Sequence, residues 1–553
     1  MPAHSDKILD QSPCVVAKGL RFELDDGQPL IEDVSLTLGK FQCGLVGKNG
    51  SGKTTLIKIL VGEVPPVRGT VERLCNIAYL PQDLKQDHEM CVADVLGIAG
   101  KLAAIKRIEE GAYEDNLLEV VGTDWDIADR ARRELAKLRL DYIPFDRTLD
   151  GLSGGEKTRL MLASLLLKKP DFLILDEPTN NLDYSSREAL YSLMRGWPGG
   201  SLIVSHDRSL LRLMNQIVEL SNGRIRIYGG NFDSFADQRL IEDQAAQRAV
   251  TAAEQFVKRE RIASQRSLER QQKRNSSGKK LRPKSGQAKI ILGVWKERSQ
   301  KTTGRLRAIH ERRIEHARQN LEVAKASIRP ENRLYVDLSK TELPHGKTVI
   351  RVERLLFAYP DEPGRPILKD FSLSVVGPER IAIHGTNGSG KTTLLRLIVG
   401  DLKPTAGRIF VGVDCVAYLP QSTFMLDENQ TVLDNFCKLS DCKNPNLGRQ
   451  MLSKFLFRDR DVFKPVRLLS GGERIRLALG SVLSRENPTQ LLIIDEPTNY
   501  LDLDSIEQLE SGLQDYRGAL IVVSHDLDFL KAIGIERELT LADRVHSQFR
   551  GSA

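Results

Sequence analysis

Long apolar runs are missing from this chain of 553 residues. No apolar run approaches the ~18 residues needed to span a bilayer, and the first eleven residues are too polar for a signal peptide. Aromatic residues make up only 6% of the sequence, but the hydrophobic content of 41% is ordinary for a globular protein. We therefore expect a cytoplasmic protein that needs no membrane subunit.

Cysteine is also sparse, and its spacing excludes two further classes. The seven cysteines form no CxxC pair and have no histidine at metal-ligand spacing. Neither a disulfide framework nor an iron–sulfur domain is supported. The length exceeds what one core accommodates and suits two α/β domains of about 200 residues with an additional segment.

A glycine-rich loop is the first chemical signal in the chain. Residues 47–54 read Gly-Lys-Asn-Gly-Ser-Gly-Lys-Thr, a GxxxxGK[ST] loop that follows an apolar run. This pattern predicts strand, loop and helix, with backbone N–H groups around phosphate oxygens. Lys53 would contact the β- and γ-phosphates, and the Thr54 hydroxyl suits Mg²⁺. Residues 385–392 repeat the loop, with Lys391 and Thr392 in the matching places.

Four further motifs follow each loop in the same order. They are a glutamine, an LSGGE sequence, an apolar run ending in Asp-Glu-Pro, and a histidine. In the first half these are Gln82, residues 152–156, residues 172–178 and His206; in the second they are Gln421, residues 469–473, residues 491–497 and His525. The Asp-to-His spacing is 30 positions in both halves. The chain therefore contains two copies of one domain.

The LSGGE motif beside Asp-Glu-Pro-Thr-Asn resembles ATP-binding cassette ATPases, and the whole chain resembles the ABC-F branch. The resemblance implies an α/β fold with two P-loop NTPase domains of the ABC type joined by an antiparallel α-helical hairpin. The expected boundaries are 1–234 for the first cassette, 235–340 for the linker and 341–553 for the second cassette. The implied activity is hydrolysis of ATP with Mg²⁺, by a monomer whose cassettes pair within one chain.

The resemblance implies that each ATP site is completed by the signature turn of the opposite cassette. The first site would use Gly47, Asn49, Gly50, Ser51, Gly52, Lys53, Thr54, Thr55 and Gln82 with Ser470, Gly471 and Gly472. The second would use Gly385, Asn387, Gly388, Ser389, Gly390, Lys391, Thr392, Thr393 and Gln421 with Ser153, Gly154 and Gly155.

Phosphoryl transfer requires a positioned water and stabilisation of spread negative charge, which gives each remaining residue a role. Asp176 and Asp495 end buried strands and would hold Mg²⁺ together with Thr54, Gln82, Thr392 and Gln421. Glu177 and Glu496 would polarise the attacking water. His206 and His525 would contact the γ-phosphate. Both sites keep every group, so we expect two active sites.

The base-binding position differs between the two halves. Tyr359 stands where ABC-F proteins place an aromatic ring against adenine, whereas the matching residue in the first half is Leu24. The first site is expected to hold adenine less tightly, unless Phe22 substitutes.

Positive charge is concentrated between the cassettes. Residues 241–330 contain 23 Lys and Arg against 9 Asp and Glu, whereas the rest of the chain contains 58 against 65. Helix-favouring sequence runs to about Asn275, a basic turn-rich tip covers about 275–286, and a second helix is expected from Gln287 to Ile328. Apolar seams are expected at Ala246, Ala249, Ala253, Phe256 and Ala263, and at Ile314, Ala317, Leu321, Ala324 and Ile328.

In ABC-F proteins the corresponding linker enters the ribosomal E site and reaches P-site tRNA near the peptidyl-transferase centre. The resemblance therefore implies the ribosome, with its 23S rRNA and P-site tRNA, as partner. Lys279, Lys280, Arg282 and Lys284 are the candidates for RNA contact, because lysine and arginine neutralise phosphates. Relief of stalled translation and protection from antibiotics both use such a machine.

Two alternatives belong to other classes. The chain could energise an ABC transporter with a separate membrane protein, although a basic hairpin between cassettes is foreign to such subunits. A DNA-repair ATPase would place its coil inside one cassette. One smaller feature stays open: Gln82 to Leu152 spans 70 positions against 48 in the second half, so 22 extra residues around 101–121 form either a ribosome-contacting arm or a plain helix pair.

Overall fold

The computed structural model describes residues 12–82, 90–111, 114–180, 182–280, 308–325, 334, 338–360, 364, 366–421 and 425–541, with the backbone alone at 271, 272 and 274–280. Its contacts divide the chain into two units. One unit is Met1–Phe232 together with Asn332–Ala553, and the other is Asp233–Glu331. Within the described ranges, none of the helices combines the length and apolarity that a bilayer span requires.

The first cassette contains two sheets. An antiparallel sheet has the order β2-β1-β4, and a six-stranded sheet has the order β5-β6-β7-β3-β8-β9, in which only β9 is antiparallel to its neighbour. The strands are β1 (Pro13–Glu23), β2 (Pro29–Gly39), β3 (Gln42–Val46), β4 (Arg68–Arg73), β5 (Ile77–Leu80), β6 (Phe172–Asp176), β7 (Gly200–Val204), β8 (Gln216–Ser221) and β9 (Arg224–Gly229).

The helices of the first cassette cover its sheets and build a helical subdomain. They are α1 (Lys53–Val61), α2 (Val92–Val95), α3 (Ala99–Glu109), α4 (Asp115–Val121), α5 (Ile127–Lys137), the 3-10 turn η1 (Leu149–Gly151), α6 (Gly154–Leu167), α7 (Tyr184–Gly196) and α8 (Arg208–Leu211). The 22 extra residues form a helix pair, α3 and α4, with its own apolar cluster of Ala104, Leu117 and Val121.

The second cassette repeats this plan. Its antiparallel sheet has the order β11-β10-β13, and its parallel sheet has the order β14-β15-β16-β12-β17. The strands are β10 (Thr348–Phe357), β11 (Leu368–Val376), β12 (Arg380–Gly385), β13 (Ala406–Val411), β14 (Val416–Leu419), β15 (Leu491–Asp495), β16 (Ala519–Val523) and β17 (Arg537–Leu541).

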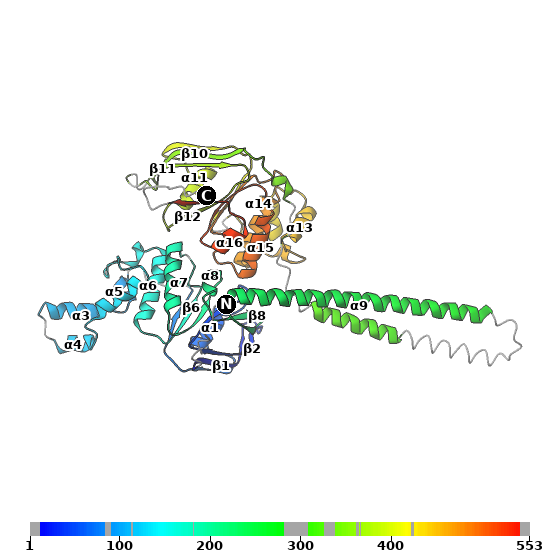
Figure 1. The fold of residues 1–553 in the computed structure, drawn as a ribbon, viewed down its shortest axis with the longest axis horizontal. Coiled ribbons are helices and arrows are strands. Elements are labelled where there is room, and N and C mark those ends of the chain that lie inside the picture. Colours follow the sequence, from blue (N-terminus) through cyan, green and yellow to red (C-terminus); the bar gives the residue numbers. More distant parts are fainter. Residues whose placement is uncertain are drawn as a thin grey trace, which may run out of the picture. The chain divides into compact units, whose positions relative to one another are not determined.

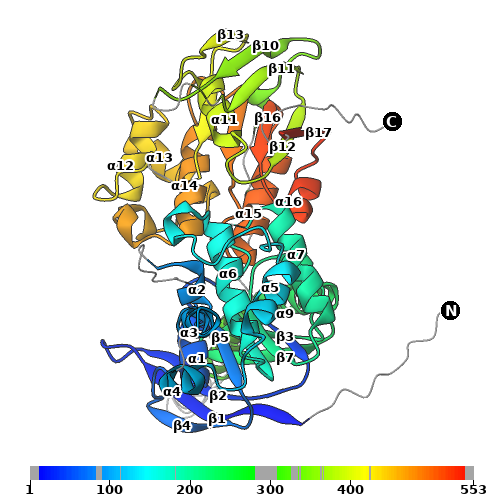
Figure 2. The same ribbon diagram turned by 90° about the vertical axis from the view of Figure 1, so that its left-hand side faces the viewer.

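The helices of the second cassette follow the same order as those of the first. They are η3 (Ser339–Thr341), α11 (Lys391–Val399), α12 (Val432–Leu439), α13 (Pro445–Lys454), η4 (Asp461–Phe463), η5 (Val466–Leu468), α14 (Gly471–Leu483), α15 (Leu503–Gln514) and α16 (Leu527–Ala532). Helix α11 contacts both β12 and β13, so it lies between the two sheets (Figure 2).

The central strands consist mainly of apolar residues because both faces of a parallel sheet are covered. Every residue of β6, β7, β15 and β16 is buried. In the second cassette the core divides into two clusters that share no residue, one with α14 and α15 and the other with α11 and the antiparallel sheet. Asp176 and Asp495 are the last residues of β6 and β15, so each parallel sheet places one carboxylate at the C-terminal edge of its strands.

The linker unit is an antiparallel pair of helices, α9 (Phe232–Lys280) and a helix over residues 308–325 (Figure 1). At ~1.5 Å per residue, the 49 residues of α9 extend about 73 Å. Helix α9 therefore continues past Asn275, where the sequence analysis ended it. The flanking residues are good helix formers, and one Asn, two Ser and one Gly cost less than the helix gains by continuing.

The apolar residues that pack between the two linker helices differ in part from those predicted. Beyond the first turn of α9, Val250 and Val257 are buried, and Ala246 and Ala253 are half-buried beside them, whereas Ala249, Phe256 and Ala263 are exposed. Two valines therefore shift the contact line by one residue. In the second helix Ala317 is fully buried and Ile314, Leu321 and Ala324 are half-buried, as expected. Ile328 lies outside the described residues.

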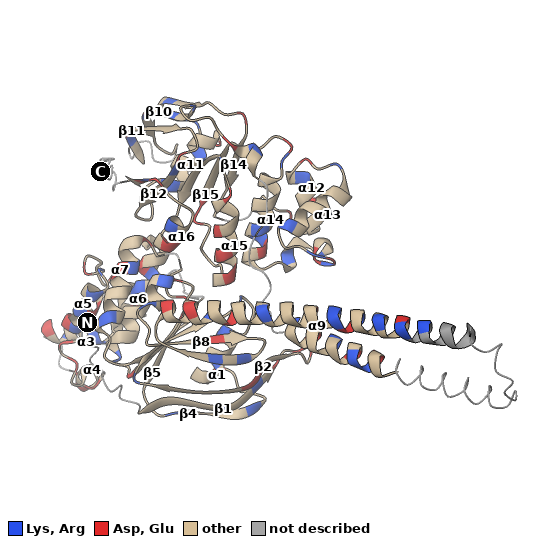
Figure 3. Cartoon of the chain, turned by 45° about the vertical axis from the view of Figure 1, so that its right-hand side comes forward, with Lys and Arg blue, Asp and Glu red and all other residues tan. Residues whose placement is uncertain are grey.

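Charge is graded along α9. Acidic residues lie near its start and basic residues further along (Figure 3). Lys325 Nζ lies 3.7 Å from Glu254 Oε1, an ion pair that joins the two arms. Of the predicted RNA contacts, Lys279 and Lys280 end α9, and Arg282 and Lys284 lie outside the described residues.

Candidate ATP-binding and catalytic sites

The phosphate loop of each cassette ends in a glycine that no other residue can replace without strain. Gly52 precedes α1 with φ of 96°, and Gly390 precedes α11 with φ of 95°. A Cβ atom at Gly52 would lie 2.9 Å from Leu30 Cγ, and one at Gly390 would lie 2.6 Å from Ile367 Cγ2. Both the backbone conformation and the available space therefore require glycine. The backbone can consequently approach a phosphate closely.

The loop lysines are buried and held by the loops themselves. Lys53 Nζ donates hydrogen bonds of 2.6 and 3.0 Å to the carbonyl oxygens of Gly47 and Lys48. Lys391 Nζ makes matching bonds of 2.7 and 3.0 Å in the second loop. Burial lowers the pKa of both lysines, and the neighbouring carboxylates oppose that shift. The ammonium groups are thus fixed at the centre of each loop.

The two loops fit the triphosphate of ATP. The hydroxyl oxygens of Ser51 and Ser389 are buried and have no hydrogen-bond partner within the described ranges, as expected of groups that point toward a ligand. The other predicted binding residues lie in the loops or the first turn of α1 and α11. They are Gly47, Asn49, Gly50, Thr54 and Thr55, and Gly385, Asn387, Gly388, Thr392 and Thr393.

Oxygen ligands suited to Mg²⁺ gather beside each loop. Thr392 Oγ1 donates a 2.7 Å hydrogen bond to Asp495 Oδ2, and Asp176 and Asp495 are 2% and 3% exposed. Burial raises the pKa of Asp495, against the effects of Thr392 and Lys391. Gln421 lines a small cavity with Asp495. These residues would hold a bound Mg²⁺, which would neutralise charge on the phosphates.

The glutamates that follow the strands have a left-handed backbone, with φ of 50° at Glu177 and 47° at Glu496. This conformation costs a non-glycine residue on the order of 1–3 kcal/mol and occurs at functional sites. Backbone hydrogen bonds hold it, because the N–H of Glu177 donates to Val204 O at 2.9 Å and that of Glu496 donates to Val523 O at 2.8 Å. The turn aims each carboxylate at a histidine.

Each glutamate and histidine form a close buried pair. His206 Nε2 lies 3.1 Å from Glu177 Oε1, and His525 Nε2 lies 3.2 Å from Glu496 Oε1. Burial raises the pKa of Glu177 to about 8 and that of Glu496 to about 7. Burial also lowers the pKa of both histidines to about 3. Neutral imidazoles and carboxyl groups that titrate near neutrality are suited to proton transfer during hydrolysis.

The loop after each glutamate contacts the phosphate loop of the other cassette. Asn49 N donates to Asp502 Oδ2 at 2.8 Å, and Asn49 Nδ2 donates to Tyr500 O at 2.9 Å. On the other side, Asn387 N donates to Asp183 Oδ2 at 3.4 Å. Contacts from both directions therefore join the cassettes head to tail.

The signature turns begin helices α6 and α14. Ser153 and Ser470 cap these helices through reciprocal bonds with the glutamate three residues on. Gly154 and Gly155, like Gly471 and Gly472, form the first turn. A Cβ atom at Gly471 would lie 3.6 Å from the Tyr500 carbonyl oxygen, which also accepts from Asn49. Tyr500 thus connects the second signature turn with the first phosphate loop.

The predicted base-binding positions differ as the sequence indicates. Tyr359 lies edge-on to Phe357, with ring centroids 5.1 Å apart, and its hydroxyl is 3.2 Å from Thr393 Oγ1. Leu24 is 45% exposed. Phe22 of β1 is paired with Ile31 of β2, and Phe357 of β10 is paired with Leu368 of β11 in the same way. Phe22 thus corresponds to Phe357 and packs against the core, so it does not replace Tyr359.

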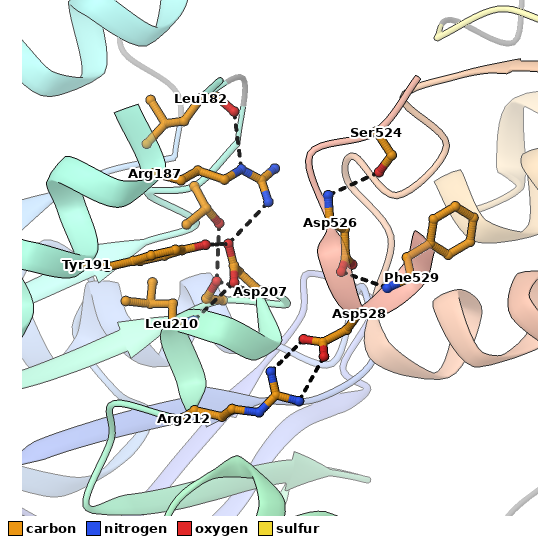
Figure 4. A network of polar contacts seen from close by, with 12 residues as sticks. Leu182, Arg187, Tyr191, Asp207, Leu210, Arg212, Ser524, Asp526, Asp528 and Phe529 are labelled. Carbon is orange, nitrogen blue, oxygen red and sulfur yellow. Dashed lines mark hydrogen bonds and ion pairs between the residues drawn. The ribbon is translucent and has the colours of Figure 1, made fainter. Parts of the chain in front are cut away.

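Sequence reasoning missed two groups of residues. Tyr418 hydrogen-bonds Asp495 from β14, and the Tyr-Leu-Pro-Gln sequence repeated in both halves is a signal that could have found it. The second group joins the cassettes through paired charges. Arg208 Nη1 and Nη2 lie 2.7 and 3.3 Å from the carboxylate oxygens of Glu510. Arg212 donates hydrogen bonds of 2.6 and 3.0 Å to Asp528, as Figure 4 shows. No motif marks these residues.

Known proteins resemble the whole chain. A family model described as ABC transporter matches residues 31–180 and 368–499. The ATP-binding protein Uup of Haemophilus influenzae is 32% identical over 531 residues, which cover 91% of this chain and 75% of Uup. ABC transporter F family member 5 of Arabidopsis thaliana is 29% identical over 559 residues, which cover 95% of this chain and 74% of that protein.

A solved structure shares the fold. It is the archaeal ribosome recycling factor aABCE1 in complex with the stalk protein aP1, at 20% identity and a TM-score of 0.55, with 94% of this chain and 87% of that chain covered. The fold and the paired sites define a tandem ATP-binding cassette ATPase, which uses ATP with Mg²⁺. Given relatives that cover 91% and 95% of its length, the chain belongs to the ABC-F family.

Proposed function

We propose that this protein is a translation factor that binds the ribosomal E site with its cassettes closed on ATP. Its linker would then act on P-site tRNA near the peptidyl-transferase centre, either relieving stalled translation or protecting it from antibiotics. Hydrolysis of ATP would release the protein.

The concentration of positive charge in the linker carries this proposal. Residues 241–330 hold 23 basic and 9 acidic side chains. A spacer between two ATPase domains needs no such excess, whereas a probe that enters an RNA-rich site does. Phosphate neutralisation supplies much of the affinity for nucleic acid and steers association.

A second support comes from what related folds bind. Solved structures with the fold include an archaeal recycling factor in complex with a ribosomal stalk protein, and a ribosome-bound archaeal Pelota and ABCE1 assembly, the latter with a TM-score of 0.50 at 20% identity. A tandem cassette fold is therefore compatible with ribosome binding. The candidates for RNA contact remain Lys279, Lys280, Arg282 and Lys284.

Trapping the ATP-bound form tests the proposal. The doubly substituted Glu177→Gln/Glu496→Gln chain should sediment with ribosomes when ATP is present, because closure without hydrolysis prevents release. A matched control replaces two exposed glutamates, Glu353→Gln and Glu486→Gln, and should leave the chain largely free. Sedimentation of the trapped chain apart from ribosomes would refute the proposal. Co-purification with an integral membrane protein would favour a transporter subunit.

A further inference from the structure

A cluster of buried charges lines a cavity between the two cassettes, next to Glu177 and His206. Asp207 directly follows His206, and Asp526 directly follows His525. Each aspartate caps the next helix, since Asp207 Oδ1 accepts from Leu210 N and Asp526 Oδ1 accepts from Phe529 N, both at 3.0 Å. The two carboxylates lie on opposite sides of the cassette interface and line one cavity of about 20 Å³ (Figure 4).

Arg187, on α7, is the arginine that lines this cavity. It is 8% exposed, its Nε donates to Leu182 O at 3.2 Å, and its Nη1 donates to Asp207 Oδ2 at 3.2 Å. The Tyr191 hydroxyl donates to the same Asp207 oxygen at 2.5 Å. The guanidinium points toward the turn of the second cassette that carries Ser524 and Asp526 (Figure 4). Arg187 is therefore fixed by one cassette and faces the other.

The electrostatics agree with this geometry. Burial raises the pKa of Asp526, the charge of Asp207 raises it further, and the charges of Arg208 and Arg187 oppose the shift. Two like charges that face each other in a poorly hydrated place repel strongly. Arg187 lies where it offsets that repulsion.

The position in the second cassette that matches Arg187 carries no charge. A constant offset of 319 positions relates Asp183 to Asp502 and His206 to His525. By that offset Arg187 corresponds to Ile506, which lines the same cavity. The cation is thus supplied by the first cassette alone.

We infer that Arg187 is a positioning residue that couples the two ATP sites, by holding Asp207 of the first cassette and facing Asp526 of the second. Through it the turn that carries His206 is linked to the turn that carries His525. Closure at one site thereby favours closure at the other. The inference depends on ATP hydrolysis by paired cassettes and is independent of the proposed action on ribosomes.

The coupling is measurable as a ratio of rates. The turnover of the unmodified chain is divided by the summed turnover of the Glu177→Gln and Glu496→Gln variants, each of which leaves one site able to hydrolyse. Independent sites give a ratio of about one. Coupling free energies in proteins usually correspond to factors of roughly 5–150. We expect a ratio of about ten, falling to about one when Arg187→Ile introduces the residue of the counterpart position.

A second substitution distinguishes coupling from a purely structural role. Asp526→Asn keeps the helix cap, since asparagine caps as well as aspartate does, but removes the opposing charge. Added to Arg187→Ile, it should restore most of the ratio. Arg187→Lys, which keeps the charge, should retain at least half. Arg195→Ile, an exposed position on the same helix, is the matched control and should change nothing.

Three results would overturn the inference. One is an unchanged ratio in the full-length Arg187→Ile chain. Another is failure of Asp526→Asn to restore any of the lost coupling. If Arg187→Ile does not fold, Arg187→Lys and Asp526→Asn are assayed alone, and a ratio of about one in the lysine variant contradicts the role assigned to Arg187.

Discussion

The two ATP sites agree closely in the groups that face the nucleotide and differ in the groups behind them. The distances between His206 and Glu177 and between His525 and Glu496 are 3.1 and 3.2 Å. One shell further out, Arg208 pairs with Glu510, whereas the counterpart positions are Leu527 and Tyr191, which cannot form an ion pair. Duplication has preserved the chemistry and allowed the interface around it to become one-sided.

The one-sided pairing suggests that the cassettes are held together unequally. Arg208 and Glu510 are each 11% exposed, so water screens their attraction little. Arg212, which directly follows α8, forms a second ion pair with Asp528, and the matching positions in the repeat are Lys531 and Ser209. The interface around α8 is therefore the more strongly charged side.

The largest effect is expected from replacing either of the two glutamates that are predicted to be catalytic. Replacing Glu177 or Glu496 with glutamine should lower hydrolysis at its own site by roughly 10²–10³-fold, since we propose that the carboxylate acts on the attacking water. Single-turnover assays of each variant measure the site that remains. If either substitution leaves total turnover intact, the corresponding glutamate is not the catalytic base.

Removing the one-sided ion pair should have the next largest effect. Arg208→Ala leaves Glu510 without its partner, so cassette pairing should weaken by roughly 3 kcal/mol. Energy transfer between dyes on the two cassettes measures this as a higher ATP concentration for closure. Leu527→Ala at the counterpart position is the control. Equal effects of the two substitutions would show that the interface is energetically symmetric.

Exchange of the base-binding residues should alter the two sites in opposite directions. Tyr359→Leu should weaken ATP binding at the second site, and Leu24→Tyr should strengthen it at the first, each by about 1 kcal/mol or fivefold. Equilibrium binding to chains with one phosphate loop disabled measures each site separately. Binding that does not respond at either site would exclude stacking at this position.

The smallest effect concerns stability without nucleotide. Because burial raises the pKa of Glu177 to about 8 and of Glu496 to about 7, the folded chain holds protons that the unfolded chain loses at ordinary glutamate pKa values. Below about pH 6.5 the unfolded chain also gains protons at His206 and His525, whose pKa burial lowers to about 3, and this offsets the two glutamates. Stability should then fall as pH rises from about 6.5 through 7 to 8. Glu177→Gln should remove a part of the decline that extends to about pH 8, whereas Glu496→Gln should remove only a part that ends near pH 7. Melting curves between pH 5 and 8 test this; parallel slopes for all three chains would contradict it.

Local sequence predicted much of the ATP sites. A phosphate loop is encoded by consecutive residues, so the glycines, Lys53 and the helix after them follow from one motif. Asp176 and Asp495 could be placed because a fully apolar strand ends at each. The helical linker was also readable, since its charge and spacing repeat along one segment.

What the sequence did not reveal depends on distant partners. Arg208 and Glu510 are 302 positions apart, and Arg212 and Asp528 are 316 apart, so no local pattern pairs them. In the sequence Arg187 is an ordinary arginine of a predicted helix, and only the fold shows that it is buried beside Asp207. The predicted end of α9 is wrong for the opposite reason. The turn-forming residues at 275–278 favour a helix end when they are considered alone, but the long helix continues through them.

The central claim is that each ATP is bound by both cassettes, and a structure of the Glu177→Gln/Glu496→Gln chain with ATP and Mg²⁺ tests it most directly. The account predicts that the ATP on Lys53 contacts Ser470 and Gly472, and that the ATP on Lys391 contacts Ser153 and Gly155. Nucleotides held by single cassettes, with both signature turns facing solvent, would contradict it.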